Sequence, residues 1–147
     1  MTGDTRGHVA AIVLLREDGA ALLQHRDDKP GLPHAGMWTP PGGHCEPHEA
    51  IETCARREFR EETAYELGDL YLLDDFIDDH VAGFPPLHLT VFWSRYDGRQ
   101  PVECREGQGL EFIERSRASR MAVPGYLVAL WDRALQSAGI DVEAAER

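Results

Sequence analysis

Short apolar runs alternate with two longer amphipathic segments along this chain. Apolar and β-branched residues predict four strands, at His8–Leu15, Ala20–Arg26, Leu70–Ile77 and Leu87–Tyr96, and shorter ones at Met37–Pro40 and Leu110–Ile113. Glu17-Asp18-Gly19 predicts a hairpin turn, and residues 27–36, with two prolines and two glycines, predict a loop. The strands therefore predict a sheet with one hairpin at its start.

Two helices are expected, at Pro47–Thr63 and at Met121–Ala138. Gly139 ends the second helix, and residues 142–147 read as a frayed tail. Strands divided around a central helix, with another helix at the end, predict an α/β class fold, an α/β/α sandwich around a mixed β-sheet. The chain is expected to form a single domain over 1–147, with its core at about 6–140.

The first helix carries acidic residues on a face that should be apolar. Ile51, Cys54 and Ala55 form one stripe, which Glu58 and Glu62 continue, with Glu61 just beside it. Residues three and four apart share a helix face, so the three carboxylates can reach one cluster. The pattern favours a divalent-metal site, because hard cations prefer oxygen ligands. The alternative is a solvated acidic helix face.

The segment from Gly43 to Tyr65 resembles the signature of the Nudix hydrolases, in its MutT-like form. Gly43, Glu49 and the run Arg57-Glu58-Phe59-Arg60-Glu61-Glu62 are all in register with that signature. The chain departs from it at His48, Ala64 and Tyr65, and no departure removes a carboxylate. The resemblance implies hydrolysis of a diphosphate linked to another group, with Mg²⁺ or Mn²⁺ as cofactor.

The resemblance also implies roles for individual residues. Glu61 and Glu62 become metal ligands, and Glu58 becomes a ligand or the group that positions or deprotonates water. Gly42 offers a backbone carbonyl to the metal, and Gly43 supports the turn. Arg57 pairs with Glu49 and holds the helix against the preceding loop. Arg57, Glu58, Glu61 and Glu62 are therefore the expected catalytic residues.

A further carboxylate is expected from the loop after the sheet, where Glu103, Glu106 and Glu111 are candidates. Residues 105–112 resemble the Glu-Gly-Gln segment of MutT-type enzymes, which favours Glu106 as a metal ligand. Arg26, Trp38 and Trp93 are the expected substrate-binding residues, since an arginine can face phosphates and aromatic rings can stack on a base.

These features predict a nucleotide pyrophosphatase, most simply one that hydrolyses a nucleoside triphosphate. A nucleotide-sugar or ADP-ribose type diphosphatase is the first alternative. A non-catalytic nucleotide-binding domain of the same fold is the second. Homodimers are common in the family, so a homodimer is compatible with the resemblance.

Composition and net charge limit the kinds of partner that we expect for this protein. The 147 residues carry a net charge of −11, which argues against a nucleic-acid-binding surface. No apolar run approaches the ~20 residues of a membrane span, and Met1–Arg6 has no hydrophobic signal core, so no membrane partner and a cytoplasmic location are expected. Three cysteines without a Cys-x-x-Cys pair read as reduced thiols. A zinc site at His44, Cys45 and His48 lacks a fourth ligand.

Overall fold

The computed structural model describes residues 7–147 and confirms the predicted α/β sandwich around a mixed sheet. Residues 1–6, where the sequence shows no signal core, lie outside the described residues. The strands are β1 (His8–Leu15), β2 (Ala21–His25), β3 (Trp38–Thr39), β4 (Gly42–His44), β5 (Tyr71–Asp78), β6 (Leu87–Arg95) and β7 (Gly109–Ile113). The helices are α1 (Ile51–Thr63), the 3₁₀ helix η1 (Arg115–Arg120), α2 (Gly125–Ala138) and α3 (Val142–Ala145).

The sheet runs in the order β3-β2-β1-β6-β5, with β4 paired to β1 and β7 paired to β2. β1 and β6 are parallel over their whole length, from the pair His8 and His88 to the pair Leu15 and Arg95. The other pairings are antiparallel. Because β1 pairs with β6 over its whole length and also with β2 and β4, it forms the centre of the sheet.

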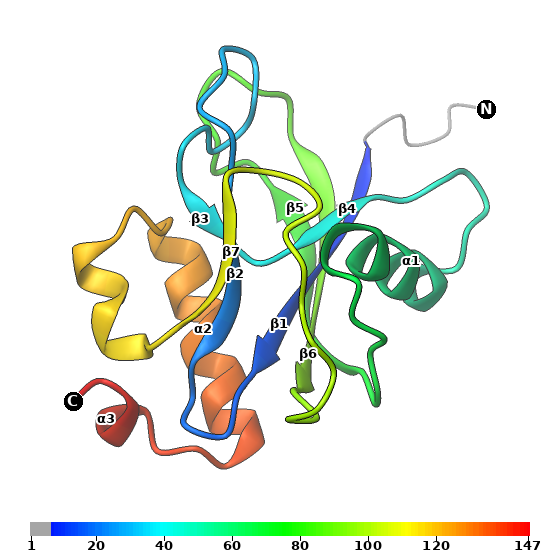
Figure 1. The fold of residues 1–147 in the computed structure, drawn as a ribbon. Helices are drawn as coiled ribbons and strands as arrows, with labels where there is room; N and C mark the ends of the chain where they lie inside the picture. The colour runs from blue at the N-terminus through cyan, green and yellow to red at the C-terminus, as the bar shows by residue number, and fades with distance from the viewer. Residues whose placement is uncertain (1–6) are drawn as a thin grey trace.

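Alternating residues of β1 face two separate cores. Ala10, Ile12 and Leu14 pack with Phe59 of α1 on one face, and Val13 packs with residues of α2 on the other. Figure 1 shows α1 and α2 on opposite sides of the strands. Each helix therefore covers one face of the same sheet, which places α1 directly against β1 and β4.

Both long helices begin later than the sequence predicts. α1 begins at Ile51 and not at Pro47, because His48 has a left-handed φ of 63° and Ala50 is extended. α2 begins at Gly125 and not at Met121, because the residue before a proline avoids the helical region and Pro124 itself has a non-helical ψ of 135°. Residues 47–50 therefore form a loop that leads into α1.

Three short elements escaped the sequence prediction: β4, the 3₁₀ helix η1 and α3. Gly42–His44 forms strand β4 through backbone pairing with Val9, Ala10 and Ala11. The expected frayed tail contains α3, where Asp141 caps the helix by accepting a hydrogen bond from the Glu143 N–H at 3.0 Å. Glu146 also forms an ion pair with Arg115 at 3.2 Å.

Among residues 7–147, no helix combines the length and the apolar character that a bilayer crossing requires.

Candidate functional site

The acidic stripe of α1 packs against the glycines of β4. A Cβ atom at Gly43 would overlap the carboxylate of Glu58, so this carboxylate lies directly against the β4 backbone. The N–H of Gly42 donates to Oε2 of Glu62 at 3.3 Å. Two of the three predicted acids thus meet the glycines of β4, one at each glycine.

Gly42 has a second constraint that comes from the sheet. A Cβ atom there would overlap the carbonyl oxygen of Ala10 and lie 2.7 Å from the Cα of Ala11. The sequence interpretation assigned the missing side chain to close approach of a metal. Packing against β1 is sufficient to require glycine at this position.

Glu62 is the buried acid of the cluster, with 8% of its surface exposed. Burial raises its pKa to about 9, and the neighbouring carboxyl groups of Glu106 and Glu58 act in the same direction. Gln24 donates to Oε2 of Glu62 at 3.3 Å. A carboxyl group in this position binds either a proton or a cation near neutral pH.

The connection between β6 and β7 brings Glu106 to Glu62. The backbone N–H groups of Glu103 and Arg105 donate to the carbonyl oxygens of Thr63 and Glu62 at 2.8 and 3.1 Å. The Gln24 amide also donates to the carbonyl oxygen of Glu106 at 3.1 Å. Of the three candidate acids, Glu106 is the one whose carboxyl group adjoins Glu62. Glu103 pairs instead with Arg105 at 3.1 Å, and Glu111 is exposed on β7.

Arg57 links the acids of α1 to the preceding loop. Its guanidinium donates to both oxygens of Glu49 at 2.7 and 2.8 Å, to Glu58 at 2.8 Å and to Glu61 at 3.2 Å. A further bond of 3.2 Å reaches the carbonyl oxygen of His44. Arg57 and the Glu46 N–H lower the pKa of Glu49 to about 2. Glu61, with its side chain 56% exposed, is the most open of the three helix acids.

Cys45 and Cys54 form a disulfide between the end of β4 and the first turns of α1, with Cα atoms 5.3 Å apart. The prediction of three reduced thiols is therefore wrong for this pair. Cys54 does occupy the predicted buried position. The cysteines are nine residues apart, and the extended loop between them folds back on α1, which sequence spacing did not reveal. Cys104 is free and exposed.

A cleft of about 330 Å³ opens at His44, the last residue of β4. The loop between β2 and β3 and the loop between β5 and β6 form its walls, side by side at the top of Figure 1. Its lining includes Pro33, His44, Asp78, Phe84 and Leu87. His44 joins the cleft to the acids, because it follows Gly43 and its carbonyl oxygen accepts from Arg57. The sequence analysis did not predict this cleft, because it arises from segments that are distant in the chain.

The three expected substrate-binding residues lie in different environments. The side chain of Arg26 donates to the carbonyl oxygen of Pro33 at 2.8 Å and so supports one wall of the cleft. Trp38 is half-buried and stacks on His25 with ring centroids 4.5 Å apart. Trp93 is 6% exposed and packs against Tyr71 and Arg95 on the α2 face. Little of the Trp93 ring is open to a nucleobase.

The donor set fits a hard divalent cation. Glu58, Glu62 and Glu106 offer carboxylate oxygens from two segments, and the pKa of Glu62 is raised by burial and, in addition, by repulsion from the neighbouring carboxyl groups. A divalent ion would relieve that repulsion. Arg57 neutralises the outer part of the cluster, where Glu61 lies.

Solved structures with the same architecture include a MutT described in work on Aliivibrio salmonicida and Vibrio cholerae. It has 22% identity and a TM-score of 0.71, with 90% of this chain and 99% of that chain covered. A Caenorhabditis elegans Ap4A hydrolase in a binary complex has 22% identity and a TM-score of 0.72, with 91% and 99% covered. The NUDIX domain of Shewanella oneidensis NrtR, complexed with ADP ribose, has 16% identity and a TM-score of 0.76, with 92% and 90% covered. At these identities the likeness shows the fold.

The family itself follows from the sequence match. The NUDIX domain model matches residues 5–126, which include β1 to β7 and the acidic helix. This match confirms the predicted class of enzyme, a hydrolase of phosphoric anhydride bonds, and Nudix hydrolases generally use divalent metal ions. The chain belongs to the NUDIX domain family.

Proposed function

We propose that this protein is a Mg²⁺- or Mn²⁺-dependent pyrophosphohydrolase of nucleoside triphosphates. The observation that carries the proposal is that the carboxyl groups of Glu58 and Glu62 lie against the two glycines of β4, with the carboxyl group of Glu106 next to Glu62. Neighbouring carboxyl groups suit a cation that in turn binds the negative oxygens of a diphosphate. The reaction is attack of water on phosphorus, giving a nucleoside monophosphate and pyrophosphate.

Each residue of the acidic cluster has a distinct role in this proposal. Glu62 and Glu106 hold the cation from the buried side, and Glu61 approaches it from the exposed side. Glu58 binds the cation or accepts a proton from the attacking water. Arg57 orients Glu58 and Glu61 through bonds of 2.8 and 3.2 Å. When bound, the metal polarises phosphoryl oxygens and promotes ionisation of the attacking water.

The cleft beside His44 is the proposed site of the nucleoside. Its volume of about 330 Å³ lies at the lower end of the usual range for ligand pockets. Phe84 offers an aromatic surface for a base, and Arg26 braces the opposite wall through Pro33. Trp38 stays in the proposal as a support of the β3 end. Trp93 is left out because its ring is buried.

A hydrolysis screen with product identification tests the proposal. It would include nucleoside triphosphates, oxidised triphosphates, ADP-ribose, nucleotide sugars, dinucleoside polyphosphates and coenzyme A, with Mg²⁺ and separately with Mn²⁺. We expect one triphosphate to give monophosphate and pyrophosphate, with complete inhibition by EDTA. Glu61→Gln should lower turnover at least about 100-fold, since it removes a charged metal ligand. Glu52→Gln, an exposed change on the same helix, is the matched control.

The outcomes separate the candidate functions. Unchanged turnover in Glu61→Gln, with matching melting curves, would contradict the metal assignment. ADP-ribose or a nucleotide sugar as best substrate would favour the second candidate, a diphosphatase of that type. Its support is the fold shared with a domain that was crystallised with ADP ribose. Binding of nucleotides without release of any phosphate product would indicate a non-catalytic domain.

A further inference from the structure

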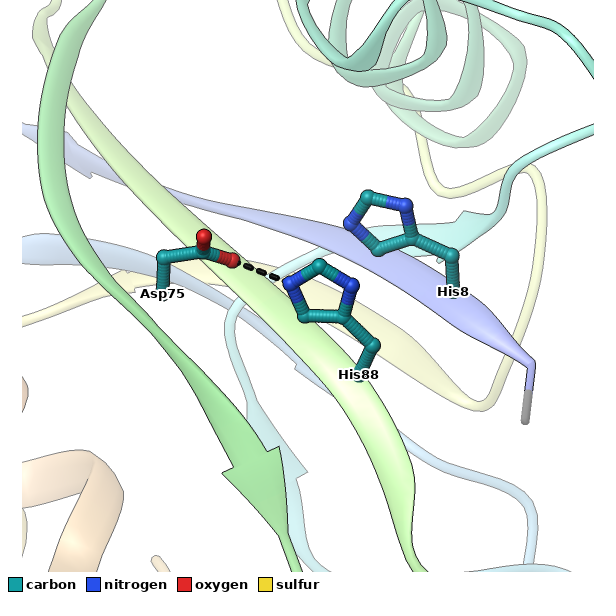
Figure 2. Close-up of side chains that lie close together, drawn as sticks. All are labelled: His8, Asp75 and His88. Carbon is teal, nitrogen blue, oxygen red and sulfur yellow. Dashed lines mark hydrogen bonds and ion pairs between the residues drawn. The ribbon is translucent and has the colours of Figure 1, made fainter. Parts of the chain in front are cut away.

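A second group of metal-ligating side chains lies on the sheet, separate from the acidic cluster. The group consists of His8 of β1, His88 of β6 and Asp75 of β5. One ring nitrogen of each histidine and one carboxylate oxygen of the aspartate all lie within 4.8 Å of one another. Figure 2 shows the three side chains rising from neighbouring strands, with Asp75 bonded to His88. None of the three belongs to the Nudix signature.

Strand register explains why these residues meet. His8 and His88 are direct partners in the parallel pair of β1 and β6, and their rings stack with centroids 3.9 Å apart and planes 2° apart. Asp75 is the antiparallel partner of Thr90, which lies two residues from His88 and so on the same face. All three side chains are therefore fixed to adjacent strands of one sheet.

A single hydrogen-bond network connects the group. Nε2 of His8 donates to the hydroxyl of Thr90 at 2.8 Å, and that hydroxyl donates to Oδ1 of Asp75 at 2.8 Å. Nε2 of His88 donates to the same Oδ1. Both rings thus direct Nε2 toward a common carboxylate, and these are the atoms that would bind a cation.

The charge balance favours a cation over protons at this position. Burial and the neighbouring His88 lower the pKa of His8, and hydrogen bonds from Thr90 and His88 lower the pKa of Asp75. These shifts favour a neutral His8 and an ionised Asp75, which are the states that ligate metals. Two stacked imidazolium rings would repel each other, whereas one divalent ion serves both.

From these observations we propose that His8, His88 and Asp75 form a binding site for a divalent transition-metal ion of the zinc class. Two imidazoles and one carboxylate match the ligand preference of such ions and differ from the all-oxygen set preferred by Mg²⁺. Ligands of one zinc ion lie about 3.3 Å apart, so small rotations of the two rings close the site. The side chains of His88 and Asp75 are 34% and 50% exposed, which leaves an open side for entry and for water as a further ligand.

Zinc binding at Nε2 changes the tautomer of both rings. In the hydrogen-bonded network Nε2 carries the hydrogen, and in the metal-bound site it must lie on Nδ1. Long-range ¹H–¹⁵N spectra distinguish these forms for each of the seven histidines in the chain. The measurement uses the full chain with excess Mg²⁺, which occupies hard carboxylate sites but competes poorly for imidazole. It does not depend on hydrolysis, so it stands or falls apart from the proposed function.

One equivalent of Zn²⁺ should move the Nε2 signals of His8 and His88 and leave the other five histidines unchanged. No change in these two signals at one equivalent, or a change at His44 or His48 in their place, would overturn the proposal. The free thiol of Cys104 is removed beforehand by Cys104→Ser, so that it does not contribute a ligand.

Calorimetry on matched variants provides the second readout. His8→Gln, His88→Gln and Asp75→Asn should each weaken zinc affinity by at least about tenfold. His48→Asn should not, because His48 is exposed and Asn tolerates its left-handed φ of 63°. Equal affinity in wild type and both histidine variants would overturn the proposal. His8→Gln at the start of β1 and His88→Gln within β6 are independent tests, and melting curves verify the fold of each.

Discussion

At the scale of single residues, the acidic cluster consists of carboxyl groups held in different states. Glu49 is fully ionised through Arg57, whereas buried Glu62 resists ionisation beside Glu106. Arg57 contacts three acids at once, which requires a planar, forked cation. The ionisation of each acid near α1 therefore depends on its burial and its hydrogen-bond partners.

Arg57→Lys should lower kcat by about 10- to 100-fold with little change in melting temperature. A lysine ammonium cannot bind both oxygens of Glu49 and still reach Glu58, so the acids lose their alignment. Steady-state kinetics on the best substrate is the measurement. Arg60→Lys, on the same helix but in an exposed pair with Glu66 at 3.6 Å, is the control and should retain wild-type kcat.

Glu62 should make the metal-free protein less stable as pH rises. Its pKa is about 9 in the folded state against an ordinary value of 4.5, so the folded state binds the additional proton between these pH values. The free energy of unfolding therefore decreases from about pH 5 to about pH 9. Glu62→Gln should flatten this dependence. Denaturant titrations in EDTA measure it, and identical pH profiles for both proteins would contradict the assignment.

At the scale of elements, the two long helices differ from the sequence prediction at their first residues. Apolar runs located β1, β2 and β6, because these strands are buried, and Gly139 located the end of α2. The predicted end of α1 at Thr63 also agrees with the structure. β4 could not be found this way, since Gly42-Gly43-His44 has no alternation and becomes a strand only by pairing with β1. The start of α1 depends on His48 and Ala50, whose backbone conformations no pattern records.

The candidate site divides in the same way. Glu58 and Glu62 of α1 were predictable because they continue the core-facing stripe, with Glu61 just beside it. The convergence of Glu106 depends on backbone bonds from residues 103 and 105 to the end of α1, which are tertiary contacts. The burial of Trp93 and the cleft at Phe84 are also tertiary features, because they depend on how segments distant in the chain pack together.

Ala64→Gly should stabilise the protein by about 0.5–1 kcal/mol. Ala64 ends α1 with a left-handed φ of 66°, a conformation that costs an alanine more than a glycine. Gly139 ends α2 with a φ of 75° and has open space where a methyl group would lie, so Gly139→Ala is the reverse experiment and should destabilise. Thermal melting decides, and shifts of the same sign in both variants would contradict this explanation.

At the scale of the whole molecule, the net charge of −11 is unevenly matched by cations. Arg57 neutralises the outer acids, but within residues 7–147 no guanidinium pairs with the neighbouring carboxyl groups of Glu62 and Glu106. The folded protein therefore holds the carboxyl groups of Glu62 and Glu106 close together without a balancing positive charge from a side chain of residues 7–147. A bound divalent ion supplies that positive charge and couples metal binding to stability.

Mg²⁺ or Mn²⁺ should raise the melting temperature at pH 8 and raise it much less at pH 5. At the lower pH the carboxyl group of Glu62 is protonated, and the proton competes with the metal for the same oxygen. Scanning calorimetry with and without EDTA provides the comparison. The Glu62→Gln variant should show a reduced shift at pH 8, and an undiminished shift would place the metal elsewhere.

The adjacent glycines of β4 are required for different reasons, and this difference has an evolutionary consequence. A side chain at Gly42 would meet the backbone of β1, which cannot move aside, whereas a side chain at Gly43 would meet the carboxylate of Glu58. A descendant that lost Glu58 and kept only nucleotide binding would be free to replace Gly43 but would still need Gly42. The second glycine of the pair is therefore the one whose substitution in a homologue should accompany loss of hydrolysis.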